Sequence, residues 1–159
     1  MTAPEAVAVA LDGALCDTHA MWRDWLDASA SILGFDPVAL PEDRAQATAE
    51  LDRRGAGNWR TLLARWSEER APVYLRRDAA TSRAVRTLEA AGIRIGVFTD
   101  APDQLARVAL SHLGLDRRVA ALEAGDSSRQ RLLARLGEQA VVVETRRQLL
   151  DLVTYTLIP

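Results

Sequence analysis

Short apolar runs alternate with helical segments along this chain, and the alternation restricts the possible folds more than any other feature. Strands are predicted at residues 7–11, 93–100 and 140–145, with a final one at 153–158. The segments between them have the apolar spacing of helices, and most end at a glycine. Strands joined by helices of this length pair in parallel. The sequence therefore predicts an α/β fold, a Rossmann-like parallel sheet flanked by helices.

A helical segment interrupts this pattern directly after the first strand. We expect an α/β core formed by residues 1–17 and 78–159 and an all-helical cap at residues 18–77. The cap is predicted to contain helices at 19–34, roughly 42–53 and 59–71, the last one stopped before Pro72. All four tryptophans lie in the cap, where they fit either a small helical core or an exposed dimer face or substrate lid.

Composition excludes several classes of function. The net charge of -2 is unlike that of a general nucleic-acid binder. The sequence has no lysine, so Schiff-base chemistry and a P-loop are both excluded. No apolar run approaches the length of a membrane span, and the single cysteine, Cys16, fits a reducing compartment, so we expect a cytoplasmic protein.

Polar residues end three of the predicted strands: Asp12-Gly13, Thr99-Asp100 and Glu144-Thr145. In an open parallel sheet, ligands bind at the carboxyl ends of the strands. These residues also fit structural roles, because Asp-Gly is a common turn pair and the other two pairs can cap the helices that follow them.

The order of these features resembles the haloacid dehalogenase (HAD) superfamily, with a small helical cap inserted after the first strand. The resemblance places the motif D-x-D-G-T-L-x-D-[ST] on residues 10–18, "ALDGALCDT". The matching residues are Asp12, Gly13, Leu15, Asp17 and Thr18. Asp12 then takes the position of the general acid/base, while Ala10 stands where the family has its nucleophilic aspartate. A methyl group cannot attack phosphorus, so the resemblance implies a HAD-like protein that has lost phosphoaspartate catalysis.

The later motifs are matched only in part. Thr99 takes the place of the phosphate-binding hydroxyl, and Arg129 is the nearest basic candidate for the missing lysine, although Glu123 can also be aligned there. Glu144 replaces the first acid of the metal-binding motif, and the neutral Gln148 replaces the second. The resemblance thus implies weak Mg²⁺ binding through Glu144 and Asp12, or none. Without a partner, these two carboxylates would repel each other.

Three functions remain open at this point. The first is binding of a small phosphorylated or anionic metabolite. Its expected contacts are Gly13, Thr99, Asp100 and Arg129. Arg54 and Asn58, in the Gly-rich stretch "RRGAGNWR", would add contacts if that stretch closes over the site. The same stretch also fits a plain turn between helices. The second function is a weak Mg²⁺-dependent phosphatase with Asp12 as base and Glu144 on the metal. The third is a module that forms a homodimer through the tryptophan-rich cap. A further hypothesis is that Cys16, near His19 at the start of the first cap helix, is a reactive thiol.

Overall fold

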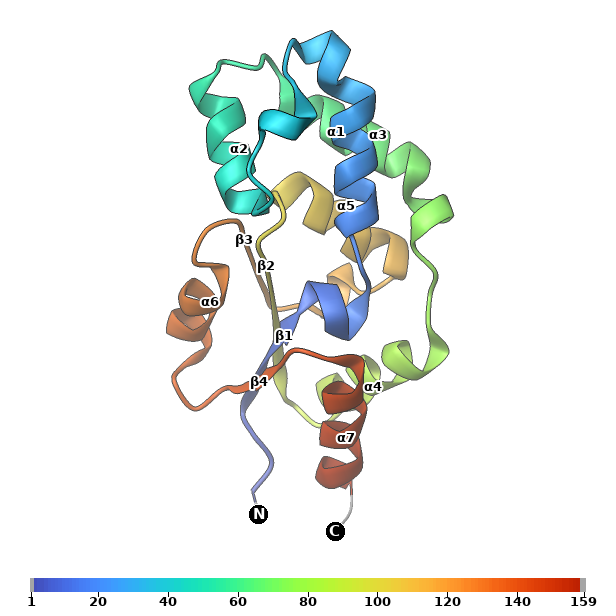
Figure 1. Ribbon diagram of the computed structural model, residues 1–159. Coiled ribbons are helices and arrows are strands. Elements are labelled where there is room, and N and C mark those ends of the chain that lie inside the picture. Colours follow the sequence, from blue (N-terminus) through green and yellow to red (C-terminus); the bar gives the residue numbers. More distant parts are fainter. Residues whose placement is uncertain (1, 158–159) are drawn as a thin grey trace.

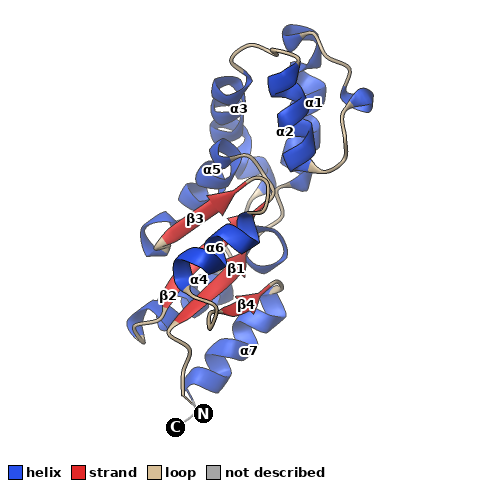
Figure 2. Ribbon diagram, turned by 90° about the vertical axis from the view of Figure 1, so that its left-hand side faces the viewer, coloured by secondary structure: helices blue, strands red, loops and turns tan. Residues whose placement is uncertain are grey.

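The computed structural model describes residues 2–157 of the chain, and within them four parallel strands form one sheet in the order β3-β2-β1-β4. The strands are β1 (Ala6–Ala10), β2 (Arg94–Thr99), β3 (Ala121–Ala124) and β4 (Val141–Val143). Helix α6 (Ser128–Leu136) covers one face of the sheet, and α4 (Ala79–Ala90) lies on the opposite face (Figure 2). The α/β sheet expected from the sequence is therefore confirmed.

The alternation of side chains along β1 explains why this strand is central. Ala6 and Ala8 face α6 and pack with Leu132 and Leu136, whereas Val7 and Val9 belong to the larger core on the other face. Every residue of β1 is buried. A strand covered on both faces needs an unbroken apolar sequence, and "AVAVA" supplies one.

The helices that follow β1 lie beyond the carboxyl ends of the strands (Figure 1). They are α1 (His19–Leu33), α2 (Arg44–Arg53) and α3 (Trp59–Tyr74). A tight turn at Leu11–Leu15, which is not helical at Asp12 and Gly13, precedes α1, and a short helical turn at Pro37–Ala39 follows it. Trp25 packs between Trp22 and Trp59, with ring centroids 5.3 and 6.0 Å away, and all three tryptophans are buried. They form the core of the helical segment, so the structure does not offer them as an exposed dimer face.

The second half of the chain supplies α5 (Asp103–Leu113), a helical turn at Asp116–Arg118, and α7 (Arg146–Leu157). Helix α3 packs against α5 as well as α1, so the helical segment rests on this part of the chain. No helix among residues 2–157 has the length and apolarity needed to cross a membrane.

The final strand predicted at residues 153–158 is wrong. Residues 146–157 form one helix, α7, and Ile158 lies outside the described residues. The β-branched residues here favour a strand locally, but packing of α7 against α4 and the buried Leu149 decides the outcome. The hydroxyls of Thr154 and Thr156 donate to carbonyl oxygens one turn earlier, so both are satisfied within the helix.

Two further differences concern strand β3 and the end of α3. The sequence "ALEA" is composed of good helix formers and carries no strand signal, yet it pairs with residues 96–99 of β2. Helix α3 continues past Pro72 to Tyr74 instead of stopping before it. Because Pro72 lies in the last turn, its missing N–H costs the helix a single hydrogen bond near its end.

Candidate functional site

A pocket of about 510 Å³ lies at the carboxyl ends of β1 and β2. Ala10 and Asp12 line it from β1 and the turn that follows, and Thr99 and Asp100 line it from the end of β2. The start of α2 and the first turn of α6 complete the wall, with Asp43, Ala45, Asp126, Ser127, Ser128, Arg129 and Gln130. The structure thus brings together four of the residues expected to form the site: Asp12, Thr99, Asp100 and Arg129.

Gly13 shapes the turn that carries Asp12. Its φ angle is +99°, in a region that side chains rarely adopt, and a Cβ at this position would lie 2.6 Å from the backbone oxygen of Glu144. The turn is closed by backbone hydrogen bonds between Gly13 and Cys16 and between Cys16 and Leu11. Gly13 therefore permits the close contact between the end of β1 and the residues after β4.

All the acceptor positions of the Asp12 carboxylate are in use. Its Oδ1 accepts hydrogen bonds from the backbone N–H and the hydroxyl of Thr18, at 2.6 and 2.8 Å. Its Oδ2 accepts from Arg44 Nη2 at 2.5 Å and from Thr99 Oγ1 at 3.2 Å. A carboxylate offers about four lone-pair sites, so this one has none left for a further ligand.

Arg44 is a central residue of this site that sequence reasoning missed. It is the first residue of α2, and its side chain is only 1% exposed. Besides Asp12, it contacts Asp100 Oδ1 through Nη2 at 2.6 Å and Nε at 3.1 Å, and it donates from Nη1 to Thr18 Oγ1 at 2.7 Å. Burial lowers the pKa of Arg44, but the two carboxylates outweigh that effect and leave the pKa above its usual value.

One sequence signal could have found Arg44. A cation in the first turn of a helix opposes the helix dipole, so an arginine directly after the N-cap Asp43 is locally unfavourable. Such a residue needs a carboxylate from elsewhere in the chain, and the structure supplies two.

The expectation that Asp12 and Glu144 lack partners is wrong. Asp12 is bound by Arg44, and Glu144 Oε1 accepts from Arg129 Nη1 at 2.7 Å. The side chain of Glu144 is 54% exposed, and this residue does not line the pocket. Glu123, the other residue aligned with the missing lysine, pairs instead with Arg131 and Arg135. Each carboxylate is therefore neutralised by an arginine.

Arg54 and Asn58 do not join this site. Arg54 Nε donates to Glu50 Oε1 at 2.7 Å within one helix turn, and Asn58 Oδ1 accepts from the hydroxyl of Thr61. Arg54 follows the last residue of α2, about 15 Å along the helix from Arg44. The stretch that contains both residues is a turn between α2 and α3 and does not close over the pocket.

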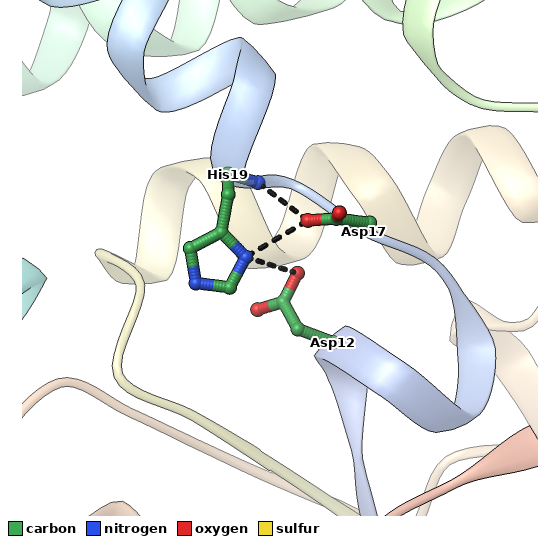
Figure 3. A group of neighbouring side chains, drawn as sticks. All are labelled: Asp12, Asp17 and His19. Carbon is green, nitrogen blue, oxygen red and sulfur yellow. Dashed lines mark hydrogen bonds and ion pairs between the residues drawn. The ribbon is translucent and has the colours of Figure 1, made fainter.

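Asp12, Asp17 and His19 form a small cluster beside the pocket (Figure 3). Their potential ligand atoms all lie within 4.8 Å of one another, and His19 Nδ1 lies 2.8 Å from Asp17 Oδ1. Hydrogen bonds from the backbone and the ring of His19 lower the pKa of Asp17. Asp17 and His19 thus satisfy each other, and the oxygen that Asp12 directs here already accepts two bonds from Thr18.

The geometry does not support a reactive thiol at Cys16. Burial raises the pKa of this thiol, and the nearby charges of Asp12 and Asp17 raise it further. His19 directs its Nδ1 to Asp17. The thiolate, which is the nucleophilic form, is therefore disfavoured.

Comparison with known proteins shows likeness at the level of the fold. No protein-family model and no curated protein matches the chain. The crystal structure of CbbY from Rhodobacter sphaeroides in complex with phosphate has a TM-score of 0.61 at 17% identity, over 87% of this chain and 76% of that one. The crystal structure of a putative beta-phosphoglucomutase from Thermotoga maritima has a TM-score of 0.58 at 15% identity, over 96% of this chain and all of that one. The fold implied by the sequence resemblance is confirmed.

Proposed function

We propose that this chain, whose fold is that of the haloacid dehalogenase superfamily, binds a small phosphorylated metabolite without hydrolysing it through a phosphoaspartate. The observation that carries the proposal is a combination of two residues: Ala10 has no nucleophilic side chain, and every acceptor site of the Asp12 carboxylate is occupied by a hydrogen bond. Ala10 lines the pocket at the position that the resemblance gives to the nucleophile. Asp12, two residues on, is saturated by hydrogen bonds.

The arrangement of Asp12 also disfavours direct attack by water. A general base must accept a proton from the attacking water, which requires a free lone pair within hydrogen-bond reach. Asp12 can offer one only by releasing Arg44, Thr18 or Thr99, and releasing Arg44 leaves a charge buried without its main partner. The weak phosphatase remains the outcome that the experiment below must exclude.

The first turn of α6 is the part of the pocket suited to a phosphoryl group. Four consecutive residues, 127–130, line the pocket there, and the first N–H groups of a helix have no partner within the helix. Ser128 is 6% exposed and lines the pocket at this turn. The neighbouring CbbY structure contains phosphate, which supports an anion in a pocket of this fold.

Charge limits what else the ligand can carry. Asp43 and Asp126 also line the pocket, and both are exposed. These carboxylates oppose a second phosphate, whereas hydroxyl or amino groups can donate hydrogen bonds to them. The pocket therefore favours a ligand with one phosphoryl group and a hydrogen-bond-donating remainder.

Calorimetric titration with inorganic phosphate and with phosphorylated sugars and amines tests the binding. We expect saturable binding to the wild type, at least a several-fold weaker affinity in Ser128→Ala, and no change in Ser111→Ala, which alters an exposed serine on α5. Absence of saturable binding to every one of these compounds would contradict the proposed ligand class.

Hydrolysis of an aryl phosphate, with and without Mg²⁺, tests the second half of the proposal. We expect no turnover by the wild type. A Mg²⁺-dependent rate in the wild type that is lost in Glu144→Ala would show instead that the protein is a phosphatase. The variant Ala10→Asp, assayed in parallel, reports whether replacing the missing carboxylate alone is sufficient for turnover.

A further inference from the structure

We infer that Arg44 takes the place of the metal ion at the carboxyl ends of these strands, so that a single positive charge from the cap offsets the mostly buried Asp12 and binds the more exposed Asp100 without a divalent cation. The resemblance to the haloacid dehalogenase superfamily implies Mg²⁺ in this region. The inference concerns the charge balance of the site and holds whether or not a phosphoryl ligand binds.

The residues present do not fit Mg²⁺. This ion requires a compact octahedron of oxygen ligands, supplied in part by one or two carboxylates. Ala10 offers none, and the Glu144 carboxylate, which does not line the pocket, is paired with Arg129. Gln148 directs its Oε1 to the backbone N–H groups of Glu144 and Thr145, at 2.8 and 3.2 Å. The oxygens that remain on Asp12 are all engaged.

The guanidinium of Arg44 lies between the carboxylates of Asp12 and Asp100. A single nitrogen, Nη2, lies 2.5 Å from Asp12 Oδ2 and 2.6 Å from Asp100 Oδ1. The other two nitrogens are also engaged, Nε by Asp100 and Nη1 by Thr18. An arginine that is 1% exposed and satisfied at every nitrogen is a built part of the site, because burying its charge without such partners would be strongly unfavourable.

Arg44 differs from a metal ion in being covalently attached to the cap. It opens α2, whose N-terminus is fixed by the hydrogen bond from the backbone of Gln46 to Asp43. Its partners come from the turn after β1, the start of α1 and the end of β2. The same contacts that neutralise the site therefore hold the start of α2 against the edge of the sheet.

The test measures thermal unfolding in EDTA and in millimolar Mg²⁺ or Mn²⁺, together with calorimetric titration of each metal. The wild type is expected to unfold at the same temperature in all conditions and to give no saturable metal binding. Arg44→Met is expected to unfold at a lower temperature, while Arg54→Met, an arginine at the other end of α2 in an exposed pair, unfolds as the wild type does. Saturable Mg²⁺ binding by the wild type, or an Arg44→Met protein as stable as the wild type, would overturn the inference.

A third variant keeps the test decisive if Arg44→Met does not fold. In the variant that combines Arg44→Met with Asp12→Asn and Asp100→Asn, no buried charge remains to be neutralised. We expect this triple variant to unfold at a higher temperature than Arg44→Met alone. If the triple variant is no more stable than the single one, Arg44 acts by packing rather than by charge, and the inference fails.

Discussion

Arg44 Nη2 lies 2.5 Å from Asp12 Oδ2, although the two residues are 32 positions apart in the sequence. The side chain of Arg44 is 1% exposed and that of Asp12 is 15% exposed, so little water reaches the contact. In such surroundings each charge stabilises the other in the folded protein, because removing one leaves the other buried and uncompensated.

A double-mutant cycle measures this dependence. Arg44→Met is expected to reduce the free energy of unfolding by about 3–5 kcal/mol, the usual cost of breaking a buried ion pair from one side. Asp12→Asn should cost less, because Asp100 still neutralises Arg44. Combining both substitutions should cost less than the sum of the two, by about 1–3 kcal/mol. Urea unfolding at neutral pH provides all four values, and strict additivity would show that the contact is energetically unimportant.

Gly13→Ala is expected to destabilise the protein by about 3 kcal/mol, from backbone strain together with overlap against the Glu144 carbonyl. Gly34→Ala is the matched control. Gly34 also has a positive φ, +73°, but a Cβ there meets nothing within 4 Å, so the expected loss is about 1 kcal/mol. Urea unfolding of both variants makes the comparison, and equal losses would mean that the contact between Gly13 and Glu144 is unimportant.

Asp78 is expected to make stability depend on pH in the acid range. It caps α4 through Thr81 and binds Arg146 Nε of α7 at 3.0 Å. The hydrogen bond from Arg146, followed by those from Thr81, lowers the pKa of Asp78 from 3.8 to about 2. Because the folded pKa lies below the unfolded one, the stabilisation is complete above about pH 4 and is lost as the pH falls toward about 2.

Asp78→Ala tests this linkage. Because the Asp78 side chain is 42% exposed, solvent weakens its ion pair, and we expect a loss of about 1 kcal/mol at neutral pH. The difference from the wild type should shrink as the pH approaches about 2. Asp78→Asn, which keeps a capping side chain without the charge, separates the cap from the ion pair. A difference that is constant between neutral pH and about pH 2 would rule out the ionised Asp78 as its source.

Cys16 is expected to react slowly with iodoacetamide in the native protein. Burial is the main reason why its pKa is raised, so little thiolate exists near neutral pH. We expect alkylation to be more than about tenfold slower than after unfolding in urea, as followed by mass spectrometry. Rapid alkylation of the folded protein would contradict this prediction and support the hypothesis of a reactive thiol at Cys16.

Local patterns in the sequence determined much of this protein's secondary structure and the edge of the sheet where its pocket lies. The apolar run of β1 predicts a buried strand, and the glycines after α1 and α5 mark where these helices end. The polar residues that end β1 and β2 predict the edge of the sheet where the pocket lies. These features depend on neighbours a few positions away, so they can be predicted from periodicity and turn chemistry.

Tertiary packing alone decided the rest. Strand β3 exists because β2 supplies hydrogen-bond partners for a sequence of helix formers, and α7 is a helix because its apolar side packs on the fold despite its β-branched residues. The partner of Asp12 is likewise set by the placement of α2 over the end of β1. A buried charge takes whichever opposite charge the fold brings within reach, and that choice is long-range information which no local pattern contains.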